Sequence, residues 1–69
     1  MKYKVSCKRQ GKKYYVSDWR SHYDTDAAYD IKVTDNKRWA TMVNLDEAAS
    51  IAKGLRQTDK FYGVNMEQV

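Results

Sequence analysis

The sequence predicts a small α+β domain, in which one helix packs on one face of a mostly antiparallel β-sheet in the order ββββαβ. Three observations support this prediction. Five short segments have the pattern of β-strands, and the links between consecutive strands are short enough for hairpins or brief loops. One segment has the periodicity of a helix. With 69 residues, no Pro and three dispersed Gly, the chain offers no linker, so we expect residues 1–69 to form a single domain.

The first two strands are predicted at residues 2–8 and 13–19. Apolar and polar residues alternate along the first segment, "KYKVSCK". The second segment, "KYYVSDW", follows after a short link and is expected to pair with the first. Gln10-Gly11 form the centre of a tight turn, with Gly supplying the positive φ. The expected pairs are Lys8 with Lys13, Cys7 with Tyr14, Val5 with Val16 and Lys4 with Ser17. A three-residue loop would instead shift the pairing by one and exchange the roles of Tyr14 and Tyr15. We prefer the first register, because it keeps the apolar residues together.

This register divides the first hairpin into two faces. The inner face holds Tyr3, Val5, Cys7, Tyr14 and Val16. The outer face, which we expect to remain in water, holds Lys2, Lys4, Lys8, Lys13, Tyr15 and Trp19. Because Cys7 lies on the inner face, we expect it to be a buried apolar residue rather than a reactive thiol. A single cysteine also fits a reducing compartment.

Residues 29–34 and 38–43 predict a second hairpin. "YDIKVT" alternates, "DNK" at 35–37 has the chemistry of a turn, and "RWATMV" returns as a strand. The length of the loop leaves two alternatives open, with either Trp39, Thr41 and Val43 or Ala40 and Met42 facing inward. The preceding segment, 20–28, is polar and acidic and is expected to be a connection.

Residues 44–57 give the clearest signal in the chain. Asn44 is a favourable N-cap, and Glu47 follows three positions later as in a capping box. The apolar stripe of the helix consists of Leu45, Ala48, Ile51, Ala52 and Leu55. The final strand is expected at 61–66, with Tyr62, Val64 and Met66 aligned.

The C-terminal half, "RWATMVNLDEAASIAKGLRQTDKFYGVNMEQV", resembles very short accessory proteins of Gram-positive phages and prophages. In those proteins a strand leads into a helix of the type "DEAxxIAxxL", and a strand that contains a valine closes the chain. Many of them have no known activity, and some inhibit host machinery, including CRISPR nucleases, by binding a protein surface. The resemblance implies a role of that kind and assigns no individual functional residue.

No catalytic or metal-binding signature is present, so we expect a protein that is not an enzyme and uses no cofactor. His22 lies beside Ser21 and Asp24, but catalytic triads are assembled from separate segments, and a polar loop is the preferred interpretation. Asp24, Asp26 and Asp30 lack the glycine and the distal glutamate of a calcium loop. No apolar run approaches the length needed to cross a bilayer, and the polar N-terminus differs from a signal peptide. We therefore expect a cytoplasmic protein with no membrane partner.

Positive charge is concentrated at the start of the chain. Residues 1–20 contain seven cations and one acid, residues 21–36 contain one cation and four acids, and residues 37–69 contain five cations and four acids. Together with the aromatic residues, this asymmetry predicts a polar binding surface. Its candidate residues are Lys2, Lys4, Lys8, Arg9, Lys12, Lys13, Tyr15, Trp19, Arg20 and Trp39.

Three functions fit this surface. The first is binding of a host protein, as an inhibitor does. The alternative is binding of DNA or RNA by the basic hairpin, with lysines on the phosphates and aromatic rings on the bases. The third is a structural or self-associating module of a virion or complex. Homodimerisation through the final strand also fits the sequence, since a small domain gains stability by association.

Overall fold

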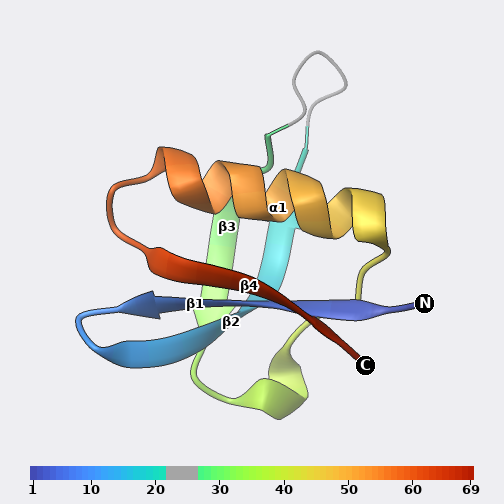
Figure 1. The fold of residues 1–69 in the computed structure, drawn as a ribbon, viewed down its shortest axis with the longest axis horizontal. Helices are drawn as coiled ribbons and strands as arrows, with labels where there is room; N and C mark the ends of the chain where they lie inside the picture. Colours follow the sequence, from blue (N-terminus) through green and yellow to red (C-terminus); the bar gives the residue numbers. More distant parts are fainter. Residues whose placement is uncertain (22–26) are drawn as a thin grey trace.

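The fold is a four-stranded antiparallel sheet with one α-helix, seen in a computed structural model that describes residues 1–21 and 27–69 (Figure 1). The strands are β1 (Tyr3–Arg9), β2 (Lys12–Arg20), β3 (Tyr29–Thr34) and β4 (Tyr62–Gln68), and the helices are the short 3-10 helix η1 (Lys37–Trp39) and α1 (Leu45–Gln57). In space the strands follow the order β3-β2-β1-β4, so that β3 and β4 form the two edges. The predicted α+β class, with one helix on a mostly antiparallel sheet, is confirmed.

The turn of the first hairpin lies where the sequence predicts it. Gln10 has a φ of 51° and Gly11 a φ of 79°, the combination of two positive φ angles that lets a two-residue loop follow the twist of its strands. The pairs Cys7–Tyr14 and Lys8–Lys13 form as expected, and Arg9 faces Lys12 at the tip.

The ladder between β1 and β2 ends at Ser6 and Tyr15, so the pairs predicted for Val5 with Val16 and Lys4 with Ser17 are absent from it. Residues 41–43 enter between the two strands instead. Tyr3 exchanges two backbone hydrogen bonds with Val43, at 2.8 and 2.9 Å, and the Thr41 N–H donates to the Val16 carbonyl at 2.9 Å.

The second hairpin predicted from 29–34 and 38–43 is therefore wrong, because its second strand belongs to another part of the sheet. The order ββββαβ holds with the fourth β element reduced to the bridge residue Val43. Asn36 explains the change: its side chain accepts a hydrogen bond from the Arg38 N–H and starts η1 in place of a strand. Neither alternation predicted for 38–43 occurs, since Ala40 and Val43 are buried while Trp39 and Met42 are exposed.

Irregular pairing between β2 and β3 overturns the position predicted for Trp19. Val16 faces Val33 and Asp18 faces Lys32, so two steps along β2 correspond to one along β3. Such a bulge exchanges the faces of the residues that follow it. Trp19 consequently packs against the core and does not lie on the outer face.

The helix begins as the capping residues predict. The Asn44 side chain accepts from the Glu47 N–H at 2.8 Å, and the Glu47 carboxylate accepts from the Asn44 N–H at 3.0 Å, so the capping box is complete. The helix packs against β1, β3 and β4. The buried core consists of Val5, Cys7, Val16, Ala28, Val43, Ala48, Ile51 and Leu55. Leu45 is an exception in the predicted stripe, because it is 54% exposed.

Gly63 produces a further bulge, this time in β4. Ser6 faces Asn65 and Lys8 faces Tyr62, so β4 contains one residue more than β1 over this interval, and Gly63 absorbs it with a φ of 58°. Tyr62 therefore shares a face with Asn65, and its predicted alignment with Met66 is wrong. Within the described ranges, 1–21 and 27–69, no helix has both the length and the apolar character required to span a membrane.

Candidate binding surface

The side of the sheet that faces away from α1 is strongly basic. Alternation along β1 and β2 places four of the predicted lysines there, and Lys37 of η1 reaches over them. We call this surface the basic face and define it by Lys2, Lys4, Ser6, Lys8, Lys13, Tyr15, Lys37 and Glu67. Its five lysines and one glutamate give an excess of four positive charges, equal to the net charge of the whole chain.

Tyr15 lies in the middle of the basic face but is buried, with 9% of its surface exposed. The ammonium groups of Lys13 and Lys37 lie 5.3 and 5.8 Å from its ring centroid. A cation is attracted to the face of an aromatic ring by the ring's quadrupole. This cation–π attraction explains why the two lysines cover the Tyr15 ring. The prediction that Tyr15 is an exposed aromatic contact is therefore wrong: no base could stack on a ring that is already covered.

Glu67 organises the lysines of the basic face. Its two carboxylate oxygens lie 3.2 Å from Lys13 Nζ and 3.6 Å from Lys37 Nζ. Partial burial acts to raise the pKa of Glu67, but the neighbouring Lys13 ammonium, the Ser6 hydroxyl and the charge of Lys37 outweigh it, so that its pKa is lowered. The adjacent Glu67 carboxylate in turn raises the pKa of Lys13. Both groups are therefore held in their charged forms.

This arrangement predicts that Glu67 contributes stability at neutral pH and loses that contribution in acid. A carboxyl whose pKa is lower in the folded state stabilises the fold above its ordinary pKa of about 4.5, and the stabilisation is lost as the pH falls through the lower folded value. Below about pH 4.5, the melting temperature of the parent should therefore fall more steeply with decreasing pH than that of Glu67→Gln. Asp59→Asn, which alters an exposed loop carboxyl, serves as the control and should follow the parent. Parallel pH profiles for the parent and Glu67→Gln would contradict this role.

Lys12 and Arg20 lie apart from the basic face, and each has an acidic partner. Lys12 Nζ is 3.1 Å from Asp35, and Arg20 Nε is 3.5 Å from Asp30. The hydrogen bond to Asp35 raises the pKa of Lys12, with a smaller contribution from the charge of that carboxylate. The structure therefore divides the predicted cations among a lysine-rich face, two separate ion pairs and Arg9 at the tip of the first hairpin.

Trp39 is the most exposed aromatic side chain in the part of the chain that the structure describes, at 72%. Its turn is held by hydrogen bonds from the Trp39 N–H to the Asn36 carbonyl and from the Arg38 N–H to the Asn36 side chain, both at 3.0 Å. The Lys4 ammonium donates to the Lys37 carbonyl at 3.2 Å, which fastens η1 to the sheet. A large apolar ring is therefore presented to solvent on a turn that is fixed at several points.

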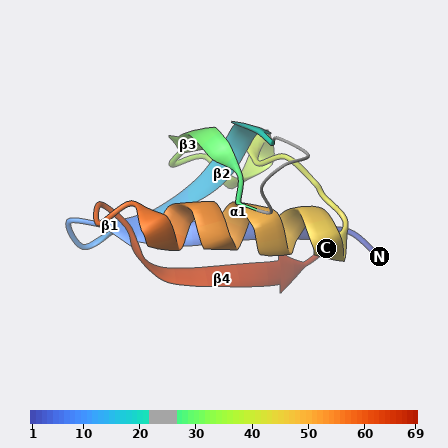
Figure 2. The same ribbon diagram turned by 90° about the horizontal axis from the view of Figure 1, so that it is seen from above.

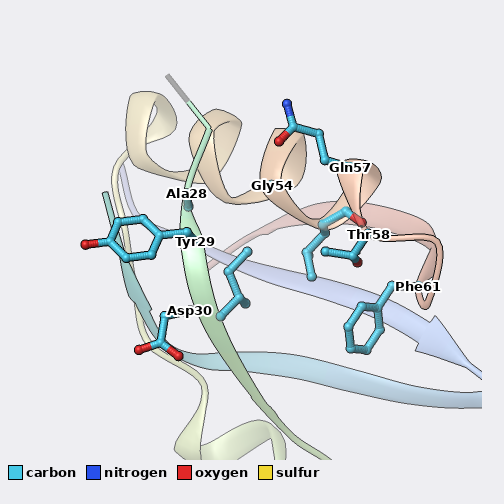
Figure 3. A pocket seen from close by; sticks show the side chains of 9 residues that line it. Ala28, Tyr29, Asp30, Gly54, Gln57, Thr58 and Phe61 are labelled. Carbon is cyan, nitrogen blue, oxygen red and sulfur yellow. Dashed lines mark hydrogen bonds between the residues drawn. The ribbon is translucent and has the colours of Figure 1, made fainter. Parts of the chain in front are cut away.

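A cavity of about 360 Å³ lies between the C-terminal end of α1 and the start of β3. It is lined by Ala28, Tyr29, Asp30, Ile31, Gly54, Leu55, Gln57, Thr58 and Phe61 (Figure 3). In Figure 3 the polar ends of Tyr29, Asp30 and Gln57 point away from the middle of this group, so they do not converge as the groups of a catalytic site do. Sequence reasoning missed this cavity, since its lining residues come from the start of β3 and the end of α1, which are far apart in the chain.

The remaining chemical candidates give no site. Cys7 is fully buried as predicted, and this burial raises the pKa of its thiol above the usual value. Among residues 1–21 and 27–69, no group of three His, Cys, Asp or Glu side chains could hold a metal ion. His22, Asp24 and Asp26 lie outside the described residues, and their interpretation as a polar loop stays a prediction.

Fold and surface together define a small α+β domain with one basic sheet face and one projecting tryptophan. Comparison of the chain with protein-family models, with curated proteins and with solved structures finds no match.

Proposed function

We propose that the protein is a non-enzymatic binding protein that attaches to a host protein, with Trp39 as its main anchor. Tryptophan is one of the residues that most often dominate the energy of protein interfaces. The hydrogen bonds around η1 support this role, because an anchor on a fixed turn loses little conformational entropy on binding. The exposure of Trp39 at 72% is the single observation that carries the proposal.

The surroundings of Trp39 indicate the chemistry of the partner. Lys37 and Arg38 precede the ring directly and are exposed, so we expect an apolar pocket with an acidic rim on the target. The resemblance of the C-terminal half to phage accessory proteins supports an inhibitory role in the host cytoplasm, as for inhibitors of CRISPR nucleases.

Trp39→Ala should weaken binding of the target about 30-fold or more, which corresponds to the loss of roughly 2 kcal/mol typical of an interface anchor. Its unfolding free energy should change little, because the side chain is mostly in water. The target would be isolated from host lysate on immobilised parent protein and then titrated against both proteins by calorimetry. Met42→Ala is the matched control, since it removes another exposed apolar side chain from the same segment. Equal affinity of Trp39→Ala and the parent would refute the proposal.

Nucleic-acid binding is the second candidate, and the excess charge of the basic face favours it. Two findings count against it. Tyr15 is buried and Trp19 packs against the core, so neither of the rings expected to stack on bases is freely exposed. Lys13 and Lys37 also already share a carboxylate. Fluorescence anisotropy with labelled single-stranded DNA, duplex DNA and RNA, at about 50 and 200 mM salt, tests this candidate. Micromolar binding that is lost in Lys4→Glu/Lys8→Glu but retained in Trp39→Ala would place nucleic acid ahead of a protein target.

A further inference from the structure

Among residues 1–21 and 27–69, no strand pairs with the outer edge of β4. The sheet ends at this strand, and Figure 2 shows no other element beyond it on its outer side. An edge strand carries a row of backbone N–H and C=O groups that can pair with a strand of another chain. The identity of the groups in this row follows from the register of the ladder.

Met66 and Gln68 direct their backbone groups to the open edge. The Val69 N–H donates to the Lys2 carbonyl at 2.8 Å, and hydrogen-bonded pairs alternate along an antiparallel ladder. Glu67 and Asn65, which are two and four residues before Val69, therefore bond to β1, and the residues between them do not. Tyr3, which faces Gln68, gives independent support for this alternation. Its N–H and C=O are both bonded to Val43 on the other side of β1, so they are not directed to Gln68.

The two edges of the sheet differ in how they resist pairing. β3 contains Lys32 and lies beside two irregularities of register, features that hinder the addition of a strand. β4 contains no Lys and no Pro, and its register with β1 is regular from Asn65 to Gln68. Its only charged side chain, Glu67, is turned onto the basic face by Lys13 and Lys37. The bulge at Gly63 lies outside this regular stretch, so the edge of β4 lacks the usual protection from Asn65 to Gln68.

We propose that β4 pairs antiparallel with β4 of a second copy of this chain, about a two-fold axis at Met66. This register places each Met66 beside its counterpart, Val64 opposite Gln68, and Asn65 opposite Glu67. No like charges face each other across the new ladder, and an amide meets the one carboxylate. An antiparallel edge is self-complementary under two-fold symmetry, so one surface serves both copies. Met66, which is 38% exposed, adds an apolar contact at the axis.

Substitution with proline at Met66 tests this pairing with little cost to the fold. The Met66 N–H points to the open edge, so Met66→Pro removes a donor of the new ladder and no hydrogen bond to β1. Sedimentation equilibrium between about 1 and 500 µM should show the parent shifting from its 8.1 kDa chain mass to twice that mass, while Met66→Pro remains monomeric. Met66→Leu is the matched control, because it keeps the N–H and the apolar side chain, and it should dimerise like the parent.

Met66→Lys provides a second variant in case the proline disturbs the strand. It keeps the backbone donor but places two ammonium groups beside each other at the axis, so dimerisation should weaken at least about tenfold. Circular dichroism at low concentration verifies that each variant is folded. A parent that stays monomeric up to 500 µM would overturn the proposal, as would a dimer that persists in both Met66→Pro and Met66→Lys.

Discussion

Gly54→Ala is expected to lower the free energy of unfolding by about 2 kcal/mol, although alanine is the better helix former. A Cβ atom on Gly54 would collide with the Ala28 carbonyl oxygen and would lie 3.0 Å from Ile31 Cδ1. The backbone at Ala28 cannot withdraw freely, because its N–H donates to the Ser50 carbonyl at 2.9 Å. The gain of about 1 kcal/mol from helix propensity is therefore outweighed by the displacement of β3 from the helix.

Urea denaturation of Gly54→Ala and the parent measures this effect. Ala49→Gly is the matched control, since Ala49 is an exposed residue of the same helix and the substitution reports the intrinsic difference between the two residues. We expect Ala49→Gly to destabilise by about 1 kcal/mol. If Gly54→Ala instead stabilised the protein by that amount, the close approach of Ala28 to α1 would be refuted.

Ile51→Ala is expected to cost about 3 to 4 kcal/mol, because Ile51 is fully buried between α1 and the sheet. Proteins retain roughly 0.05 to 0.15 kcal/mol of stability per residue, which gives about 3.5 to 10 kcal/mol for a chain of 69 residues, so this loss removes about a third of the total or more. We therefore expect a large part of Ile51→Ala to be unfolded at 37 °C. The loss of ellipticity and of the cooperative thermal transition would measure it.

Leu45→Ala is the control for Ile51, since both residues belong to the apolar stripe predicted from the sequence. Leu45 is 54% exposed, and we expect its truncation to cost less than about 1 kcal/mol. Equal losses for the two variants would mean that the helix is rotated about its axis relative to the structure.

Local chemistry explains which parts of the fold could be predicted. The turn at Gln10-Gly11 and the capping box of Asn44 and Glu47 depend on residues within a few positions of one another, and both are confirmed. The strand predicted at 38–43 failed because its partner is Tyr3, some 40 positions earlier in the chain. No local pattern reports that neighbour, and Asn36 redirects the backbone before a hairpin can close.

The sequence predicted which kinds of residue form the binding surface, but not how these residues are arranged on it. Lysines in alternate positions of β1 and β2 do gather on one face. Trp19 was predicted on the wrong face of the sheet, because the bulge in β2 leaves no recognisable pattern in the sequence. The bulge exchanges the two faces for the residues that follow it. The role of Glu67 was missed for a different reason, since its two lysines come from β2 and from η1. For Trp39 the sequence left both orientations open.

The insertion of residues 41–43 between β1 and β2 has a consequence for the order in which the chain folds. The turn-proximal part of the hairpin, up to Ser6 and Tyr15, requires only local closure and can form early. The other half of β1 has no partner in β2 and must wait until Val43 arrives from far along the chain. A single strand is therefore expected to form in two kinetic stages, with Cys7 structured in the transition state and Tyr3 joining after it.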